Sequence, residues 1–275
     1  MHVWSTTCLP ENLDALIASL NHLDTTRLVV TRTPGKKRQL IQYFAETKLA
    51  AVNIQNEHSG SVELVSDDWK ISAPAHPPIR IRDRFLVVET ATKPLDPREI
   101  IIPAGLAFGT GDHPTTASCL RLLCDVAKGF PNKKWTLLDI GTGSGVIAIA
   151  ARKLGAGLVA GFDYDPLSIR TARENARLNH VRGIQWNQQD LLTFQAEKRY
   201  EIVTANIFSE LFLGTWKRIY PAVAPGGYFI LSGILRFQAN DCRAAIGDAS
   251  FTICHEIRLG KWVTFLAHSE SPAGK

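Results

Sequence analysis

Residues 135–145 read WTLLDIGTGSG, and this stretch decides the predicted fold. Its first four residues form a short apolar run, which is typical of a buried parallel strand. Asp139 follows, and then three glycines stand at alternate positions, Gly141, Gly143 and Gly145. Residues 146–156 (VIAIAARKLGA) carry apolar side chains at helical spacing. A strand, a glycine turn and a helix in this order present backbone amides to a ligand at a helix N-terminus.

The spacing of the glycines indicates which ligand the loop suits. A dinucleotide-binding loop has the pattern G-x-G-x-x-G, and counted from Gly141 its third glycine would stand where this chain has Val146. The Asp139 carboxylate before the turn would also repel a pyrophosphate. A cationic ligand that carries an amino acid, such as S-adenosylmethionine, fits better. The alternative is an ordinary tight turn whose glycines serve packing.

A second acidic residue follows one strand–turn–helix unit later. Residues 158–162 (LVAGF) form another apolar run, which ends at Asp163. An acidic side chain at this place can bind the two hydroxyls of a cofactor ribose. Asp165 and Pro166 are typical of a helix N-cap and first turn. Together with the glycine loop, Asp163 predicts a class I S-adenosylmethionine-dependent methyltransferase.

The rest of the large domain continues the alternation of strands and helices. Strands are predicted at 183–187, 200–205 and 228–233, and Asp190 and Asn206 follow the first two. Ligands of open α/β sheets bind outside the carboxyl ends of the strands. We therefore expect four polar residues to converge there: Asp139, Asp163, Asp190 and Asn206. With a terminal antiparallel strand pair at 251–257 and 262–267, the prediction is a doubly wound, Rossmann-like α/β sheet.

The chain is predicted to hold a small α+β domain at 1–65, a linker and edge strand region at 66–90, and the large domain at 91–275. In the small domain, spacing predicts helices over 11–22 and 35–48. Strands are expected near three further places: 27–31, 52–54 and 62–64.

Two stretches before the glycine loop are unusual. Residues 79–89 (IRIRDRFLVVE) predict a strand whose arginines form an exposed edge, or else contact an acidic partner; we favour the edge. Residues 103–116 (PAGLAFGTGDHPTT) form a glycine-rich loop around Phe108. Such a loop beside a cofactor site suggests a lid, and a plain connector is the alternative.

Composition limits the class of protein. Hydrophobic residues make up 45% and charged residues 21%, as in a folded soluble protein. No apolar run reaches the length of a membrane span, and no secretory signal is expected. Five cysteines without a C-x-x-C predict free thiols in the cytoplasm and no metal site. The net charge of +5 permits nucleic acid nearby, but no stable nucleic-acid complex is predicted.

The motifs GLAFGTGDHPTT, LLDIGTGSGVIAIAARKLGA, GFDYDP, VTANIFSEL and APGGYFILSGIL occur in this order between residues 103 and 236. In this respect the chain resembles the bacterial ribosomal protein L-eleven methyltransferase family, PrmA. The resemblance implies methyl transfer from S-adenosylmethionine to amines of a large-subunit ribosomal protein, on lysine side chains or the N-terminal α-amine. It also implies that the small N-terminal domain recognises the substrate, although residues 1–78 match the family poorly.

The resemblance carries cofactor binding to four positions of this sequence: Thr116, Gly141, Asp163 and Asn206. With the residues singled out above, the predicted cofactor site also includes Asp139, Gly143, Gly145 and Asp190. Phe108 and Asn206 are predicted to position the acceptor amine without a strong general base. His113 is expected to cap a helix or shape the loop rather than to act as a base.

Other functions stay open on sequence alone. A methyltransferase acting on another protein, a nucleic acid or a small-molecule amine is one alternative. The segment after the fourth strand, Asn206-Ile207-Phe208, lacks the Asn-Pro-Pro-aromatic pattern of DNA amino-methylating enzymes. A non-catalytic, cofactor-binding or ribosome-associated protein is a second alternative.

Overall fold

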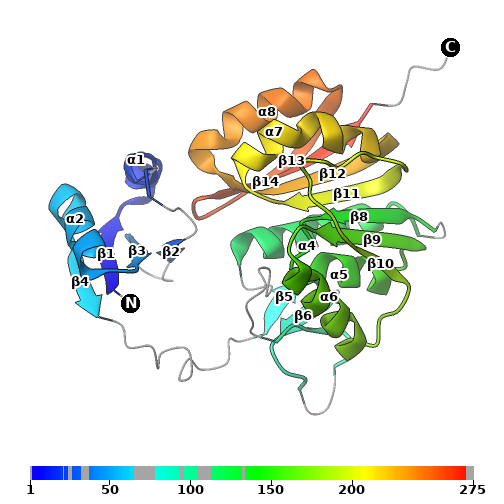
Figure 1. Cartoon of the computed structure of the whole chain (residues 1–275), viewed down its shortest axis with the longest axis horizontal. Coiled ribbons are helices and arrows are strands. Elements are labelled where there is room, and N and C mark those ends of the chain that lie inside the picture. Colours follow the sequence, from blue (N-terminus) through cyan, green and yellow to red (C-terminus); the bar gives the residue numbers. More distant parts are fainter. Residues whose placement is uncertain are drawn as a thin grey trace. The chain divides into compact units, whose positions relative to one another are not determined.

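The computed structural model describes residues 2–20, 22–23, 27–31, 37–64, 78–92, 96–103, 113–131 and 134–270. The chain divides into two compact units, Met1–Ala75 and His76–Lys275 (Figure 1). Each unit is described by itself below.

The smaller unit is a four-stranded sheet with two helices. Its strands lie in the order β2-β3-β1-β4, and the pairs within it are antiparallel. Trp4, Ile17 and Ile41 are fully buried in its core. The elements are β1 (His2–Cys8), α1 (Leu13–Ser19), β2 (Leu28–Thr31), β3 (Gln39–Ala45), α2 (Lys48–His58) and β4 (Ser61–Leu64).

The predicted helix over 35–48 and the predicted strand at 52–54 are both wrong. Residues Gln39–Ala45 form a strand that pairs with β1 on one side and β2 on the other. Burial alternates along this strand with the period of two that a half-buried strand requires. The helix begins later, where the Thr47 side chain accepts a hydrogen bond from Ala50 N at 3.2 Å. Sheet pairing on both sides overrides the helical spacing of the apolar residues.

The larger unit is built on a seven-stranded sheet in the order β10-β9-β8-β11-β12-β14-β13. The first five strands are parallel and the last two antiparallel, which confirms the predicted doubly wound sheet with its C-terminal strand pair. The strands are β8 (Thr136–Ile140), β9 (Leu158–Asp163), β10 (Ile184–Gln188), β11 (Tyr200–Asn206), β12 (Val223–Leu235), β13 (Phe251–Leu259) and β14 (Trp262–Ser269).

Helices cover both faces of this sheet (Figure 1). One face packs against α4 (Pro114–Ala127), α5 (Val146–Lys153) and α6 (Pro166–Leu178), and the other against α7 (Ser209–Ile219) and α8 (Ala239–Asp248). Two separate apolar clusters result, one on each face. Because the carboxyl ends of the parallel strands are left outside these layers, they form an accessible edge.

The expected strand over 79–89 is a hairpin instead. Residues Ile79–Ile81 (β5) and Phe85–Val88 (β6) pair antiparallel, and β7 (Glu99–Ile101) joins β6 in parallel. Arg84 N donates to Ile81 O at 3.3 Å and closes the turn. Strand β5 is at the edge of this three-stranded sheet, as expected for the arginine-bearing segment.

Asn179 joins this small sheet to α6. Its side-chain oxygen accepts from Ile101 N at 2.8 Å, and its amide nitrogen donates to Ile101 O at 2.7 Å. The Asn179→Ala substitution leaves both backbone groups of a half-buried strand unpaired. We expect it to lower the free energy of unfolding by about 1–3 kcal/mol, measured by urea titration. The exposed Asn187→Ala is the matched control, and an equal effect of both substitutions would contradict this role for Asn179.

Candidate cofactor and acceptor site

The candidate site follows the carboxyl ends of four adjacent parallel strands. Asp139 is in β8, Asp163 ends β9, Asn206 ends β11, and Asp190 comes just after β10. Neighbouring strands lie about 4.8 Å apart, so the four strand ends span roughly 14 Å. The sheet order therefore aligns the predicted residues along one edge, with Asp190 at one end and Asn206 at the other.

The glycine loop between β8 and α5 has backbone angles that favour glycine. Gly141, Gly143 and Gly145 have φ values of 65°, 52° and 79°. A Cβ atom on Gly145 would lie 2.9 Å from both the Ala172 Cβ and the Trp186 ring. Gly145 is thus required for close packing of the loop against α6 and β10. The packing interpretation of the glycines holds at this position.

Asp163 connects the second strand to the loop. One of its carboxylate oxygens accepts from Gly143 N at 3.0 Å, and the other from Asp165 N at 3.1 Å. The residue is 8% exposed. Since a carboxylate has about four acceptor positions, Asp163 keeps acceptor capacity for a diol after making these two bonds.

Asp139 lies under the loop and is 1% exposed. Its two oxygens accept hydrogen bonds from the Thr142 and Thr204 hydroxyls, each at 2.6 Å. Burial raises the pKa of Asp139 to about 6, the two threonine hydroxyls oppose this, and the charge of Asp163 adds to it. Asp139 thus connects the glycine loop to β8 and β11, and its buried carboxylate places negative charge beside the loop.

Asn206 and Thr116 meet on the other side of the loop. The Asn206 side-chain nitrogen donates to Thr116 Oγ1 at 3.4 Å, and Thr116, in the first turn of α4, is 1% exposed. The Asn206 side-chain oxygen is buried and has no hydrogen-bond partner within the described residues. An unpaired buried acceptor is costly, and a ligand donor would satisfy it.

Two predicted residues are placed differently. Asp190 is exposed, and its side chain accepts from Leu192 N at 2.8 Å, which shapes the turn after β10. Its side chain forms no hydrogen bond or ion pair with the other site residues among those described, so it lies at the rim of the edge. Phe108 and the centre of the predicted lid lie outside the described residues.

The structure also brings Trp262 and Thr204 to this site, two residues that the sequence analysis did not place there. His113 caps α4 as expected, with Nδ1 2.7 Å from Thr115 Oγ1. Its ring meets the Trp262 ring edge-on, with centroids 5.1 Å apart. The antiparallel pairing of β14 with β12 brings Trp262 to this place. Thr204 was equally hidden, as an ordinary strand residue.

His113 and Trp262 are 149 positions apart in the sequence. Over such a separation, neither periodicity nor spacing could have placed Trp262 beside His113. The contact depends on the sheet order, in which β14 lies next to β12. The one sequence signal available for Trp262 was its place as an aromatic residue at the start of the predicted strand at 262–267.

The residues at this edge fit S-adenosylmethionine, which carries a positive sulfonium and an amino-acid group. Neither Asp139 nor Asp163 forms an ion pair within the described part of the chain, so their negative charge faces no protein cation there. Asp163 retains acceptor capacity for ribose hydroxyls, and Asn206 presents an unpaired buried oxygen.

The described residues hold no group of His, Cys, Asp and Glu arranged to bind a metal ion. No helix among them is long and apolar enough to cross a membrane.

Comparisons with known proteins agree with this site. A profile of the family "Ribosomal protein L11 methyltransferase (PrmA)" matches residues 16–270. The ribosomal protein L11 methyltransferase of Bacillus subtilis (strain 168) is 33% identical over 221 residues, which are 78% of this chain and 70% of that protein. That of Bacillus cytotoxicus is 36% identical over 212 residues, 75% of this chain and 67% of that protein.

A solved structure gives the same result. The crystal structure of the ribosomal protein L11 methylase from Lactobacillus delbrueckii subsp. bulgaricus has a TM-score of 0.60 and 29% identity, over 71% of this chain and 100% of that chain. The fold and the site define a Rossmann-like, S-adenosylmethionine-dependent protein methyltransferase. Within that class, the chain belongs to the ribosomal protein L11 methyltransferase (PrmA) family.

The raised pKa of Asp139 predicts a pH-dependent stability. An acid whose folded-state pKa of about 6 exceeds its ordinary value of 3.8 binds protons more tightly when folded, so its ionisation destabilises the fold as pH rises through this window. Asp139→Asn removes this effect. Relative to wild type, we expect the variant to gain up to about 3 kcal/mol in unfolding free energy between pH 4 and pH 7.

Urea unfolding at several pH values measures this difference. The exposed Asp248→Asn removes the same charge and serves as control, with no gain across the window. A stability difference between Asp139→Asn and wild type that stays constant with pH would contradict the buried, proton-binding state of Asp139.

Proposed function

We propose that this protein transfers methyl groups from S-adenosylmethionine to amines of ribosomal protein L11. Lysine side chains are the main proposed acceptors, and the N-terminal α-amine is a second candidate. The buried, unpartnered side-chain oxygen of Asn206 carries the proposal for an amine acceptor. The names of the relatives suggest the protein that bears the amine.

Asn206 is proposed to orient the amine. Its nitrogen is used by Thr116 Oγ1, and this bond fixes the amide so that the oxygen is the group left for a ligand. An amide oxygen accepts a hydrogen bond from an amine N–H and thereby directs the nitrogen lone pair elsewhere. Holding the two reacting atoms in line is a large part of the barrier reduction in such a bimolecular transfer.

The acceptor lysine must lose a proton, because its ordinary pKa is about 10.4 and only the neutral amine is a nucleophile. Burial disfavours the ammonium form and helps this loss. His113 Nδ1 is engaged with Thr115, which supports its capping role over that of a base. We therefore propose that the site works by positioning and burial, with no dedicated strong base.

When bound, S-adenosylmethionine supplies an electrophilic methyl group on its sulfonium. Asp163 is proposed to hold the ribose hydroxyls, and the loop from Gly141 to Gly145 to lie against the amino-acid portion. Asp139 supports that loop from below, and Asp190 is proposed to lie near the adenine edge. Phe108 remains a predicted lid residue.

Two further assignments complete the proposal. The small domain at 1–65 is proposed to recognise the protein substrate. The five cysteines are all free thiols, which supports a reducing cytoplasmic location.

Methyl transfer from radiolabelled S-adenosylmethionine into an undermethylated cell extract tests the function. We expect one labelled band, ribosomal protein L11, and loss of that band with Asp163→Ala. Label in another protein would reassign the substrate, and label in nucleic acid or small molecules would overturn the protein methyltransferase. Cofactor binding without any label would favour a non-catalytic protein.

The role of Asn206 is tested by Asn206→Ala. We expect kcat to fall by about 100-fold, because an oriented hydrogen bond to the reacting group is lost. Calorimetric binding of S-adenosylmethionine should weaken much less than kcat falls. The exposed Asn187→Ala is the matched control. An unchanged kcat in Asn206→Ala would refute the proposed orientation of the amine.

A further inference from the structure

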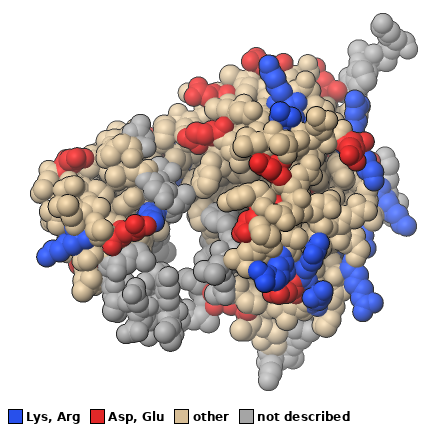
Figure 2. All heavy atoms as spheres, in the orientation of Figure 1, with Lys and Arg blue, Asp and Glu red and all other residues tan. Residues whose placement is uncertain are grey.

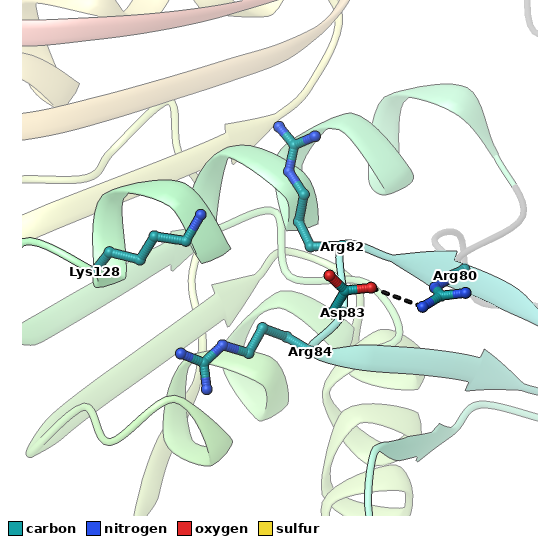
Figure 3. Close-up of a pocket in the computed structure, with 5 residues that line it drawn as sticks. All are labelled: Arg80, Arg82, Asp83, Arg84 and Lys128. Atoms are coloured by element: carbon teal, nitrogen blue, oxygen red, sulfur yellow. Dashed lines mark hydrogen bonds and ion pairs between the residues drawn. The ribbon is translucent and has the colours of Figure 1, made fainter.

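A second site is suggested by a basic pocket away from the carboxyl edge of the sheet. It has a volume of about 460 Å³ and is lined by Arg80, Arg82, Asp83, Arg84 and Lys128. In Figure 3, Arg82 and Arg84 extend from the β5–β6 turn, and Lys128 faces them from the end of α4. Helix α4 has 14 residues and is about 21 Å long. Its length separates this pocket, at its C-terminal end, from Thr116 in its first turn.

The cations of the pocket are only weakly neutralised. Arg80 pairs with Asp83 at 2.7 Å, but these side chains are 66% and 88% exposed, so the pair contributes little. Arg82 and Lys128 share one carboxylate, that of Asp125. The Arg84 side chain makes no hydrogen bond or ion pair within the described residues. The pocket therefore has an excess of positive charge.

Two further observations support a ligand-binding role for this basic pocket. Arg82 has a φ of 51°, in the left-handed region that costs a non-glycine residue about 1–2 kcal/mol. A strained turn that carries a long cation is a reason to look for a function. Arg121, half-buried in α4, has its pKa lowered first by burial and then by repulsion from Arg82, which indicates a positive local potential.

The chemistry of these groups selects the ligand. A guanidinium offers paired N–H donors that match the oxygens of a phosphate, and arginine is favoured where such bidentate contacts form. The side chains of Arg80, Arg82 and Lys128 are 66%, 43% and 60% exposed, so they form an open contact surface rather than an enclosed cage for a small anion. Elsewhere on the face in Figure 2, acidic and basic side chains are interspersed.

We propose that this pocket binds a backbone phosphate of RNA. An open, arginine-rich surface suits an extended polyanion, whose phosphates remain accessible along its length. The contact is weak and salt-dependent, in keeping with the absence of a predicted stable nucleic-acid complex. It is independent of the proposed methyl transfer.

Fluorescence anisotropy with a short labelled RNA of mixed sequence tests the proposal. We expect Arg80→Ala/Arg84→Ala to weaken binding by about 10-fold or more and to reduce the salt dependence by about two phosphate contacts. Asp83→Asn should tighten binding, a gain that misfolding cannot produce. The double substitution Arg170→Ala/Arg177→Ala on exposed positions of α6 removes the same charge and should have little effect.

Several outcomes would overturn the proposal. Equal weakening by both double variants would assign binding to net charge alone. Competition by polyglutamate as effective as that by RNA would indicate an acidic protein, and inorganic phosphate binding as tightly as RNA would indicate a free anion. Methylation of purified ribosomal protein L11 without RNA should be unchanged in Arg80→Ala/Arg84→Ala, so failure of this proposal is separable from failure of the proposed function.

Discussion

The buried carboxylate of Asp139 is the constraint on which the candidate site depends. Its two hydrogen bonds join the glycine loop, through Thr142, to the neighbouring strand, through Thr204. Thr204 and Asp139 are also register partners in the parallel pair of β11 and β8. A charged group with 1% exposure is stable here only because both oxygens are hydrogen-bonded. The same pair of bonds links the glycine loop to β11, the strand that ends at Asn206.

The two ends of α4 lie in surroundings of opposite charge. Its N-terminal turn holds Thr116 against Asn206, beside the carboxylates of the sheet edge. Its C-terminal end carries Asp125 and Lys128 beside the arginine turn. One helix thus spans from an acidic edge, suited to a cationic cofactor, to a basic surface, suited to an anion. The helix is well buried between them and separates the two sites.

Sequence predicted the large domain better than the small one, for a physical reason. In the large domain β8 and β9 are apolar runs, each followed by a turn and a helix, so local pattern and tertiary structure agree there. In the small domain, Leu40, Ile41 and Phe44 have helical spacing, but the buried face of the strand is Ile41, Tyr43 and Ala45, and pairing of β3 with β1 and β2 decides. Contacts between distant segments, such as Trp262 with His113 and Thr204 with Asp139, have no local pattern at all.

The glycine motif illustrates why a sequence signature is only part of a site. Gly145 is explained by its neighbours, since Ala172 and Trp186 leave no room for a Cβ. At Gly141 the nearest obstacle is the end of one side chain, Ile207 Cγ2 at 3.0 Å. Packing therefore accounts for one glycine of the motif without any ligand. The case for a ligand rests instead on the Asn206 oxygen, which packing leaves without a partner within the described residues. The negative charge of Asp139 and Asp163, which form no ion pair among those residues, adds to it. Unsatisfied polar groups, unlike glycines, require a partner.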